Sequence, residues 1–366
     1  GNELWAFDPR AYETGPTGTS PGGFKHRGVA VHGAGDDMRV FINSRDSLYA
    51  LDAKTGALIT SFGDGGQILL TEGFPNTVTR DEFDQTSPPV VFEDLVITGS
   101  RVPDRIQHRF DPPGSVQAFD VKTGERRWRF YTVPQSNDAF GADTWEDQSW
   151  RYTGHANVWG LMSLDEERGL LYVPTSTSSS DYWGGRRVGA NLFAESLLCL
   201  DARTGERQWH FQAVHHGLWD YDFPTSPNLV DITVDGRNIK ALVQVSKQGF
   251  VYTFDRVTGE PVWPIEEHPV FDPDRDSQSW GDPQHGQAQS VRQAAQALAR
   301  GQVGQRGQSQ FPADVRQVPL PLLWRPDLEH RGEADDAEQP DRPGRHVHGD
   351  PPRFALEQQP GAGSSD

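Results

Sequence analysis

A carboxylate and a lysine of this 366-residue chain could together remove a proton from a hydroxyl group and stabilise charge on an oxygen atom. Asp220 lies in segment 215–224, His-His-Gly-Leu-Trp-Asp-Tyr-Asp-Phe-Pro, and Lys247 follows 27 residues later in Ser-Lys-Gln-Gly, 246–249. A positioned carboxylate can accept a hydroxyl proton as a general base. A lysine cation stabilises negative charge that develops on an oxygen. The alternative is that Asp220 is a turn aspartate and Lys247 a solvated surface lysine.

A repeated phrase, Asp-x-x-Thr-Gly, indicates the elements that must position these residues. Its copies occupy 48–56, 116–124, 197–205 and 251–259, and apolar residues alternate before each aspartate. Alternation predicts a half-buried strand. The aspartate can accept hydrogen bonds from turn amides, and the glycine supplies the positive φ that closes a hairpin. In the last three copies a tryptophan stands four residues after the glycine, and its flat ring suits packing between neighbouring sheets.

Repetition of such hairpins predicts an all-β protein of the radial propeller type. Gly1 and Trp5 share the glycine-to-tryptophan spacing, so Gly1 is interpreted as the turn glycine of one more copy whose inner strands are missing. Each interval between successive turn glycines fits one four-stranded blade. Residues 6–263 are therefore expected to hold about four blades. We expect such an incomplete ring to expose apolar faces at its terminal blades and to be a poor enzyme as it stands.

Composition excludes several classes of function. The net charge of −18 argues against a nucleic-acid partner, since a phosphate backbone needs a basic surface. The acidity favours solubility, with acid-mediated partner binding as the alternative. No stretch approaches 18 uninterrupted apolar residues, so no membrane span is expected. Cys199 is the single cysteine, which excludes an intrachain disulfide. The chain begins without an initiator methionine or a leader, either because a signal peptide was removed or because the sequence starts within a protein.

The sequence changes character near residue 270, which predicts two regions. Residues 1–270 are assigned to the partial propeller. Residues 271–366 are poor in aromatics, lack the repeated phrase and contain no lysine, while Gln, Pro, Asp and Gly dominate. Such low-complexity composition predicts disorder. Two origins stay open for it, a genuine linker or a slip of the reading frame in a GC-rich gene.

The repeated phrase with its tryptophan resembles the blade motif of the dehydrogenases that depend on pyrroloquinoline quinone (PQQ), the quinoproteins, over residues 1–270. Segment 215–224 resembles the catalytic segment of their membrane-bound glucose dehydrogenase branch, and the resemblance extends to Lys247. It implies an eight-bladed β-propeller, N-terminally truncated here to about four blades plus a partial one, with the cofactor near the axis. It also implies that Asp220 is the catalytic base and that Lys247 contacts the quinone oxygens. Outer-membrane assembly lipoproteins share a similar blade repeat.

The same resemblance implies a set of cofactor ligands. Arg27 would pair with a PQQ carboxylate, Thr86 and Ser100 would bind carboxylates through their hydroxyls, and the PQQ ring would stack on Trp159. His26 is the nearest candidate for a histidine that caps the cofactor in this branch. Capping or strand roles remain open for Thr86 and Ser100, and a structural role remains open for His26.

The family also holds a divalent cation, Ca²⁺ or Mg²⁺, against the quinone. The resemblance implies Asp104 and Asp220 as ligands, and Ser178 falls near the position of the usual amide ligand. Hard cations prefer oxygen donors, and a hydroxyl is a poorer ligand than an amide oxygen. Asp104 could equally be a solvated loop acid.

The function implied is oxidation of a sugar, polyol or cyclic alcohol by PQQ in the periplasm. No Cys-x-x-Cys-His motif for a bound haem is present, so electrons are expected to pass to a quinone or another external acceptor. Substrate contacts lie on variable loops, and the sequence does not identify the substrate. Two alternatives are a non-catalytic propeller used for binding or assembly and an inactive fragment of the dehydrogenase.

Overall fold

The structure, a computed structural model, describes residues 1–14, 26–75, 78–79, 82–104 and 109–266. The expected low-complexity region at 271–366 lies outside these residues. None of the helices in the described ranges is long and apolar enough to cross a membrane.

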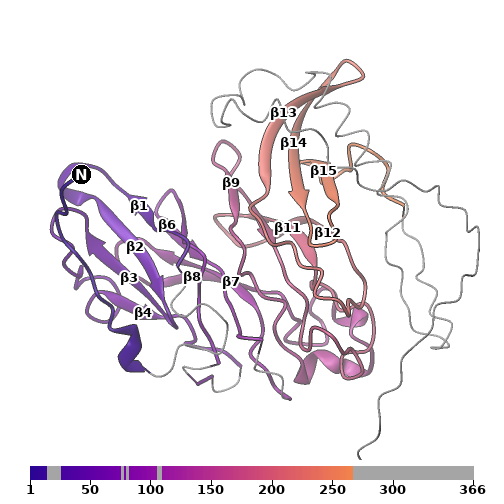
Figure 1. Cartoon of the computed structure of the whole chain (residues 1–366), viewed down its shortest axis with the longest axis horizontal. Helices are drawn as coiled ribbons and strands as arrows, with labels where there is room; N and C mark the ends of the chain where they lie inside the picture. The colour runs from indigo at the N-terminus through magenta and orange to yellow at the C-terminus, as the bar shows by residue number, and fades with distance from the viewer. Residues whose placement is uncertain (15–25, 76–77, 80–81, 105–108, 267–366) are drawn as a thin grey trace, which may run out of the picture. The chain divides into compact units, whose positions relative to one another are not determined.

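Four antiparallel sheets follow one another along the chain, and each is a meander in which strands adjacent in sequence are neighbours in space (Figure 1). The first sheet contains β1 (Ala30–His32), β2 (Arg39–Ser44), β3 (Ser47–Asp52) and β4 (Gln67–Leu69). The second contains β5 (Val90–Phe92), β6 (Leu95–Thr98), β7 (Ser115–Asp120) and β8 (Arg126–Tyr131). The third contains β9 (Ser163–Asp165), β10 (Leu170–Pro174), β11 (Ser196–Asp201) and β12 (Arg207–Gln212). The fourth contains β13 (Asn228–Val234), β14 (Arg237–Val245) and β15 (Val251–Asp255). This architecture confirms the prediction of an all-β chain built from propeller blades.

Helical structure in the described residues is limited to short 3₁₀ turns: η1 (Ala11–Thr14), η2 (Gly35–Asp37), η3 (Ala142–Thr144) and η4 (Glu146–Tyr152).

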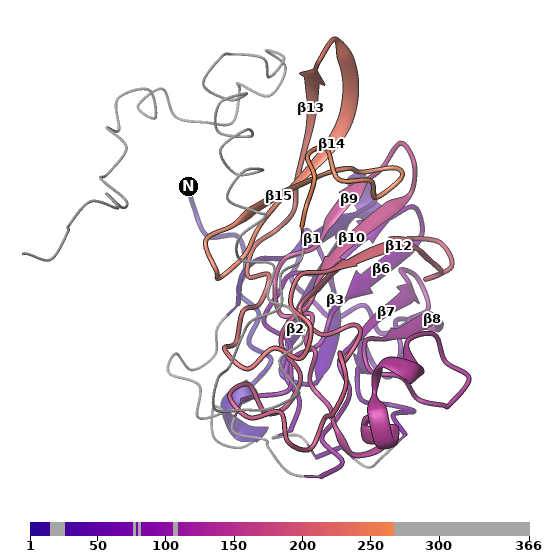
Figure 2. The same ribbon diagram turned by 90° about the vertical axis from the view of Figure 1, so that its right-hand side faces the viewer.

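The hairpin of β13 and β14 is paired over its whole length, from Asn228↔Val243 to Val234↔Arg237, and it projects past the neighbouring strands (Figure 2).

The repeated phrase forms the hairpins expected of it. The third strand of each sheet ends at the aspartate of one copy, at Asp52, Asp120, Asp201 and Asp255. In the third copy, Asp201 Oδ1 accepts the amide hydrogens of Arg203 at 2.7 Å and Thr204 at 3.2 Å. Gly205 then takes a φ of +74°, and its amide donates to the Asp201 carbonyl at 2.8 Å. The same carboxylate contacts recur in the other three copies.

The tryptophan of one copy packs on the turn of the next. Trp128 Nε1 donates to the Ala202 carbonyl at 3.1 Å, and its ring covers Gly205 so closely that a Cβ there would lie 2.5 Å from a ring carbon. Trp209 makes the same contacts with Arg256 and Gly259. Trp5 makes them with Ala53 and Gly56, as the motif spacing at the start of the chain predicts. The turn glycine is therefore required both for its φ and for the space that the ring occupies.

The core lies between successive sheets, because the inner strands are buried on both faces. On β6, Val96 packs toward the first sheet with Phe41 and Leu48, whereas Leu95 and Ile97 pack toward the third sheet. The alternation continues on β11, where Leu198 and Leu200 face the second sheet and Leu197 and Cys199 face the fourth. A side-chain period of two gives each strand two apolar faces, which stacked blades need.

The contact between tryptophan and glycine leads to a stability prediction. Gly205→Ala is expected to destabilise the protein by about 2–4 kcal/mol, since the methyl group adds overlap with Trp128 to the strain of an alanine at positive φ. Gly236→Ala is the matched control, because Gly236 has a φ of +76° and nothing lies within 4 Å of a Cβ there. Gly236→Ala should lower the free energy of unfolding by about 1 kcal/mol. Urea unfolding of both variants measures the difference, and equal losses would show that the ring contact is unimportant.

Candidate active site

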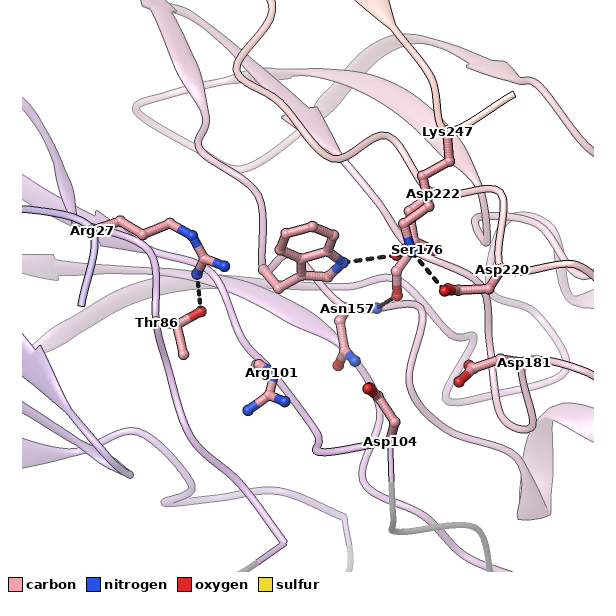
Figure 3. A pocket seen from close by; sticks show the side chains of 11 residues that line it. Arg27, Thr86, Arg101, Asp104, Asn157, Ser176, Asp181, Asp220, Asp222 and Lys247 are labelled. Atoms are coloured by element: carbon pink, nitrogen blue, oxygen red, sulfur yellow. Dashed lines mark hydrogen bonds and ion pairs between the residues drawn. The ribbon is translucent and has the colours of Figure 1, made fainter. Parts of the chain in front are cut away.

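A cavity of about 160 Å³ gathers polar side chains from all four sheets (Figure 3). Its lining consists of residues that lie either just before the first strand or just after the second strand of a sheet: Arg27, Thr86, Arg101, Asp104, Asn157, Trp159, Ser176, Asp181, Asp220, Asp222 and Lys247. In an antiparallel meander these two positions lie at the same end of the sheet. The blades therefore bring together residues that are up to 220 positions apart in sequence.

Trp159 lines the cavity and lies close to two cations. The guanidinium carbon of Arg27 is 5.3 Å from the indole centroid, and the ammonium nitrogen of Lys247 is 5.7 Å from it. The indole nitrogen donates a hydrogen bond to Asp222 Oδ2 at 2.9 Å. The hydroxyl of Ser87 donates to the backbone carbonyls of Trp159 and Gly160. The ring is thus fixed by its side chain and by its backbone, as a stacking platform must be.

Lys247 joins the two carboxylates of the predicted catalytic segment. Its Nζ lies 2.7 Å from Asp220 Oδ2 and 2.9 Å from Asp222 Oδ2. Burial disfavours the lysine cation, but the two negative charges outweigh that effect and raise the pKa of Lys247. Burial, aided by the charge of Asp220, raises the pKa of Asp222 to about 6, although Lys247 acts in the opposite direction. The sequence prediction that Asp220 and Lys247 share one site is consistent with this geometry.

Positive charge dominates the side of the cavity formed by the first two sheets. Arg27 donates from Nη1 to the hydroxyl of Thr86, and it forms no ion pair with a carboxylate in the described parts of the chain. Arg101 is already paired, with Nη1 at 3.0 and 2.8 Å from the two carboxylate oxygens of Asp84. Arg27 is therefore the guanidinium whose charge is available to an anionic ligand.

Most of the carboxylates, Asp181, Asp220 and Asp222, line the opposite side, whereas Asp104 follows β6 of the second sheet. Asp181 is 9% exposed, and burial, followed by the charges of Asp220 and Asp104, raises its pKa to about 7. These carboxylates are of the type that hard cations prefer. Among the residues that the structure describes, however, no three acidic, histidine or cysteine side chains lie close enough together to hold a metal ion. The arrangement does not fit an assembled metal centre, and no step below is assigned to a metal.

Three predicted site residues lie away from the cavity lining. Ser100 is fully buried, and its hydroxyl accepts the amide hydrogen of Ser115 at 2.7 Å. Ser178 is also fully buried and pairs with His155 through an isolated bridge. The Nδ1 atom of His26 accepts the amide hydrogen of Gly28 at 3.2 Å. The side chains of Ser100 and His26 thus make local structural contacts, whereas the buried hydroxyl of Ser178 has no hydrogen-bond partner among the described residues. The binding roles of all three stay predictions.

Five lining residues were not predicted from the sequence: Arg101, Asn157, Ser176, Asp181 and Asp222. Two of them hold neighbouring loops together. The Asn157 side chain accepts the Val102 amide hydrogen at 2.8 Å and donates to the Val102 carbonyl at 3.0 Å. The Ser176 hydroxyl accepts the Asn157 amide hydrogen at 2.8 Å. Asp222 is the most important omission, because it contacts both Trp159 and Lys247.

Comparison with known proteins matches most of this chain to one family. Residues 1–299 match the family described as the β-propeller domain of PQQ glucose/ethanol/alcohol dehydrogenases. The match extends past residue 270, where the resemblance was expected to end.

Two curated relatives and one solved structure illustrate the similarity. Quinate/shikimate dehydrogenase (quinone) of Acinetobacter baylyi is 36% identical over 236 residues, which cover 63% of this chain and 28% of that protein. Quinoprotein glucose dehydrogenase of Gluconobacter oxydans is 34% identical over 290 residues, which cover 74% of this chain and 34% of that protein. The crystal structure of quinohemoprotein alcohol dehydrogenase from Comamonas testosteroni aligns with a TM-score of 0.61 and 27% identity, covering 77% of this chain and 41% of that one.

The chain thus spans about a third of the length of the curated relatives that it matches. On the extent of the family match, the chain belongs to the PQQ-dependent glucose/ethanol/alcohol dehydrogenase β-propeller family.

Proposed function

We propose that the cavity binds PQQ and belongs to a dehydrogenase that oxidises a sugar, polyol or cyclic alcohol. One observation carries the proposal: the cations of Arg27 and Lys247 lie 5.3 and 5.7 Å from the centroid of a fixed indole ring. A flat, anionic quinone fits such a site, because its ring can stack on Trp159 while its carboxylates and carbonyl oxygens meet positive charge.

When bound, PQQ supplies a quinone that accepts hydride from the alcohol carbon. The chain's own residues supply position and charge. Asp220 accepts the hydroxyl proton of the alcohol as that hydride leaves. Lys247 Nζ, 2.7 Å from Asp220 Oδ2, places a cation next to this carboxylate and beside the ring platform. Arg27, which has no carboxylate partner in the described ranges, orients the cofactor through one of its carboxylates.

We propose that Asp222 holds Trp159 and Lys247 in place relative to each other. Its Oδ2 accepts hydrogen bonds from the Trp159 indole and from Lys247, and its Oδ1 accepts the amide hydrogen of Thr177 at 2.8 Å. A single buried carboxylate thereby fixes the stacking ring relative to the lysine. We also propose that electrons leave to a quinone or another external acceptor and that the protein works in the periplasm, as the resemblance implies.

Substrate choice gives a direct test. The cavity side formed by Asp104, Asp181 and Asp220 is rich in carboxylates, so several substrate hydroxyls can donate hydrogen bonds there at once. With PQQ and an electron-accepting dye, kcat/KM for glucose, glycerol or quinate should exceed that for 1-butanol by at least about 10-fold, since each added hydrogen bond to a charged group contributes about 1.5–3 kcal/mol. A preference for 1-butanol would exclude the proposed substrate class, and PQQ that binds without any dye reduction would favour a non-catalytic propeller.

A further inference from the structure

Two fully buried charged residues lie outside the cavity, on the segment that connects β10 to β11. Arg187 and Glu195 are both 0% exposed. Burial raises the pKa of Glu195 to about 8 and lowers that of Arg187 to about 10. Burying such groups is unfavourable unless hydrogen bonds compensate for the lost water. Their partners therefore indicate what the pair is for.

Each of the two residues has a partner on the loop that carries Asp220. Arg187 Nη2 donates to the carbonyl of Gly217 and, at 3.0 Å, to that of Ser180. Glu195 Oε1 accepts the amide hydrogen of Tyr221 at 3.0 Å. One buried side chain thus holds the beginning of the loop and the other holds its end.

The other contacts of the loop are made at its end, where Asp220 and Asp222 bind Lys247 and Asp222 also binds Trp159 and Thr177. Of the described residues, none of the backbone amides from 217 to 222 donates to a backbone carbonyl. Asp220 has a φ of +56°, a left-handed conformation that aspartate adopts more readily than most residues but at a cost of about 1 kcal/mol. Trp219, next to it, is 69% exposed and adds no burial to stabilise the loop. The position of the Asp220 carboxylate therefore depends on contacts from outside the loop.

The fit between loop and carboxylate is close. A Cβ at Gly217 would lie 1.7 Å from Glu195 Oε2, so only a glycine lets the loop rest on this carboxylate. Glu195 also connects to the cavity, because the hydroxyl of Thr177 lies 2.9 Å from Glu195 Oε1 and 3.2 Å from Asp222 Oδ1. The loop, the buried carboxylate and the residue that fixes Trp159 thus form one network.

We propose that Arg187 and Glu195 are positioning residues. They clamp the 217–222 loop through its backbone and so set the position of the Asp220 carboxylate in the cavity. The proposal rests on the proposed function only for what Asp220 does there. Glutamine at position 195 can present the same acceptor oxygen to Tyr221, whereas alanine cannot. The acceptor, and not the charge, is what the clamp requires.

Hydrogen–deuterium exchange of the whole chain, without cofactor, tests the clamp. In Glu195→Ala, exchange of the Tyr221 amide, followed in a peptide that covers 217–222, should become at least about 10-fold faster, while exchange of β11 stays as in the wild type. Glu195→Gln should restore wild-type exchange. Glu206→Ala, an exposed glutamate on the turn after β11, is the matched control and should change nothing. Gly217→Ala leaves both charged residues in place and should accelerate exchange as Glu195→Ala does, which covers the case in which Glu195→Ala fails to fold.

Turnover distinguishes positioning from general support of the fold. With saturating PQQ, Gly217→Ala should lower kcat about 10- to 100-fold while KM changes less than about threefold, and Glu195→Gln should stay near wild type. Unchanged exchange of 217–222 in Glu195→Ala and Gly217→Ala, an unchanged kcat in Gly217→Ala, or a Glu195→Gln variant as damaged as Glu195→Ala would each overturn the proposal. Because exchange needs no cofactor, the clamp is tested even where PQQ fails to bind, and that failure would count against the proposed function alone.

Discussion

In a protein extended to the length of the curated relatives, Asp220→Asn is expected to lower turnover with PQQ about 10³-fold, because general base catalysis by a positioned carboxylate contributes about 10²–10⁴-fold. The substitution preserves most other features of the site. Asparagine is nearly isosteric, tolerates the positive φ of position 220, and offers Lys247 an acceptor oxygen in place of Asp220 Oδ2. PQQ affinity should therefore change less than about threefold.

Asp235→Asn is the matched control for this variant. Asp235 also has a positive φ, +49°, but it occupies the turn between β13 and β14 and does not line the cavity. It should retain wild-type turnover. An Asp220→Asn variant with turnover within threefold of the wild type would remove Asp220 from the role of base.

Lys247→Met is expected to weaken PQQ binding about 100-fold, which corresponds to about 2.7 kcal/mol. Methionine keeps the length of the side chain but removes the cation beside Trp159, and it leaves the charges of Asp220 and Asp222 uncompensated. Truncating one partner of a buried, hydrogen-bonded charge pair at a binding interface costs about 2–5 kcal/mol. A value toward the lower end applies here because the Lys247 side chain is 32% exposed and water screens part of its charge.

Lys240→Met provides the comparison for Lys247→Met. Lys240 lies on β14 of the same sheet and pairs with Asp231 at 2.6 Å, outside the cavity. Calorimetric titration with PQQ should give the wild-type affinity for this variant. Equal affinities for Lys247→Met and the wild type would show that the cation is not part of the binding site.

Local patterns in the sequence were sufficient to predict the hairpins. The Asp-x-x-Thr-Gly phrase specifies its own hydrogen bonds, since the contacts of Asp201 reach only two or three residues ahead. That Trp128 packs between sheets was also predictable from its size. Its partner, the turn at Gly205, was not, because it belongs to another copy of the phrase and the contact exists only once blades stack.

The cavity was predictable only in part, for the same reason. Asp220, Lys247 and Trp159 stood in recognisable phrases. Asp222 stood in the same segment, but its role depends on Trp159 and Thr177, which approach it only in the folded chain. A positional signal was available: residues just before the first strand or just after the second strand of each sheet share one end of the fold.

The serines that follow β10 show where prediction from the sequence stops. Resemblance implied Ser178 as a ligand, but Ser176 lines the cavity, whereas Ser178 is fully buried and does not line it. In a strand the direction of a side chain follows from its register. In this loop after β10 the direction depends on the local backbone, and the type of residue carries no information about it.

The central claim is that this chain binds PQQ between Arg27, Trp159 and Lys247. Calorimetric titration of the wild-type chain with PQQ, beside Trp159→Ala and Arg27→Met, tests it most directly. The account predicts saturable binding of one PQQ per chain and at least about 10-fold weaker binding in each variant, as loss of the stacking ring or of the cation for a carboxylate requires. A wild-type chain that takes up no PQQ, or variants that bind it as well as the wild type does, would contradict the account.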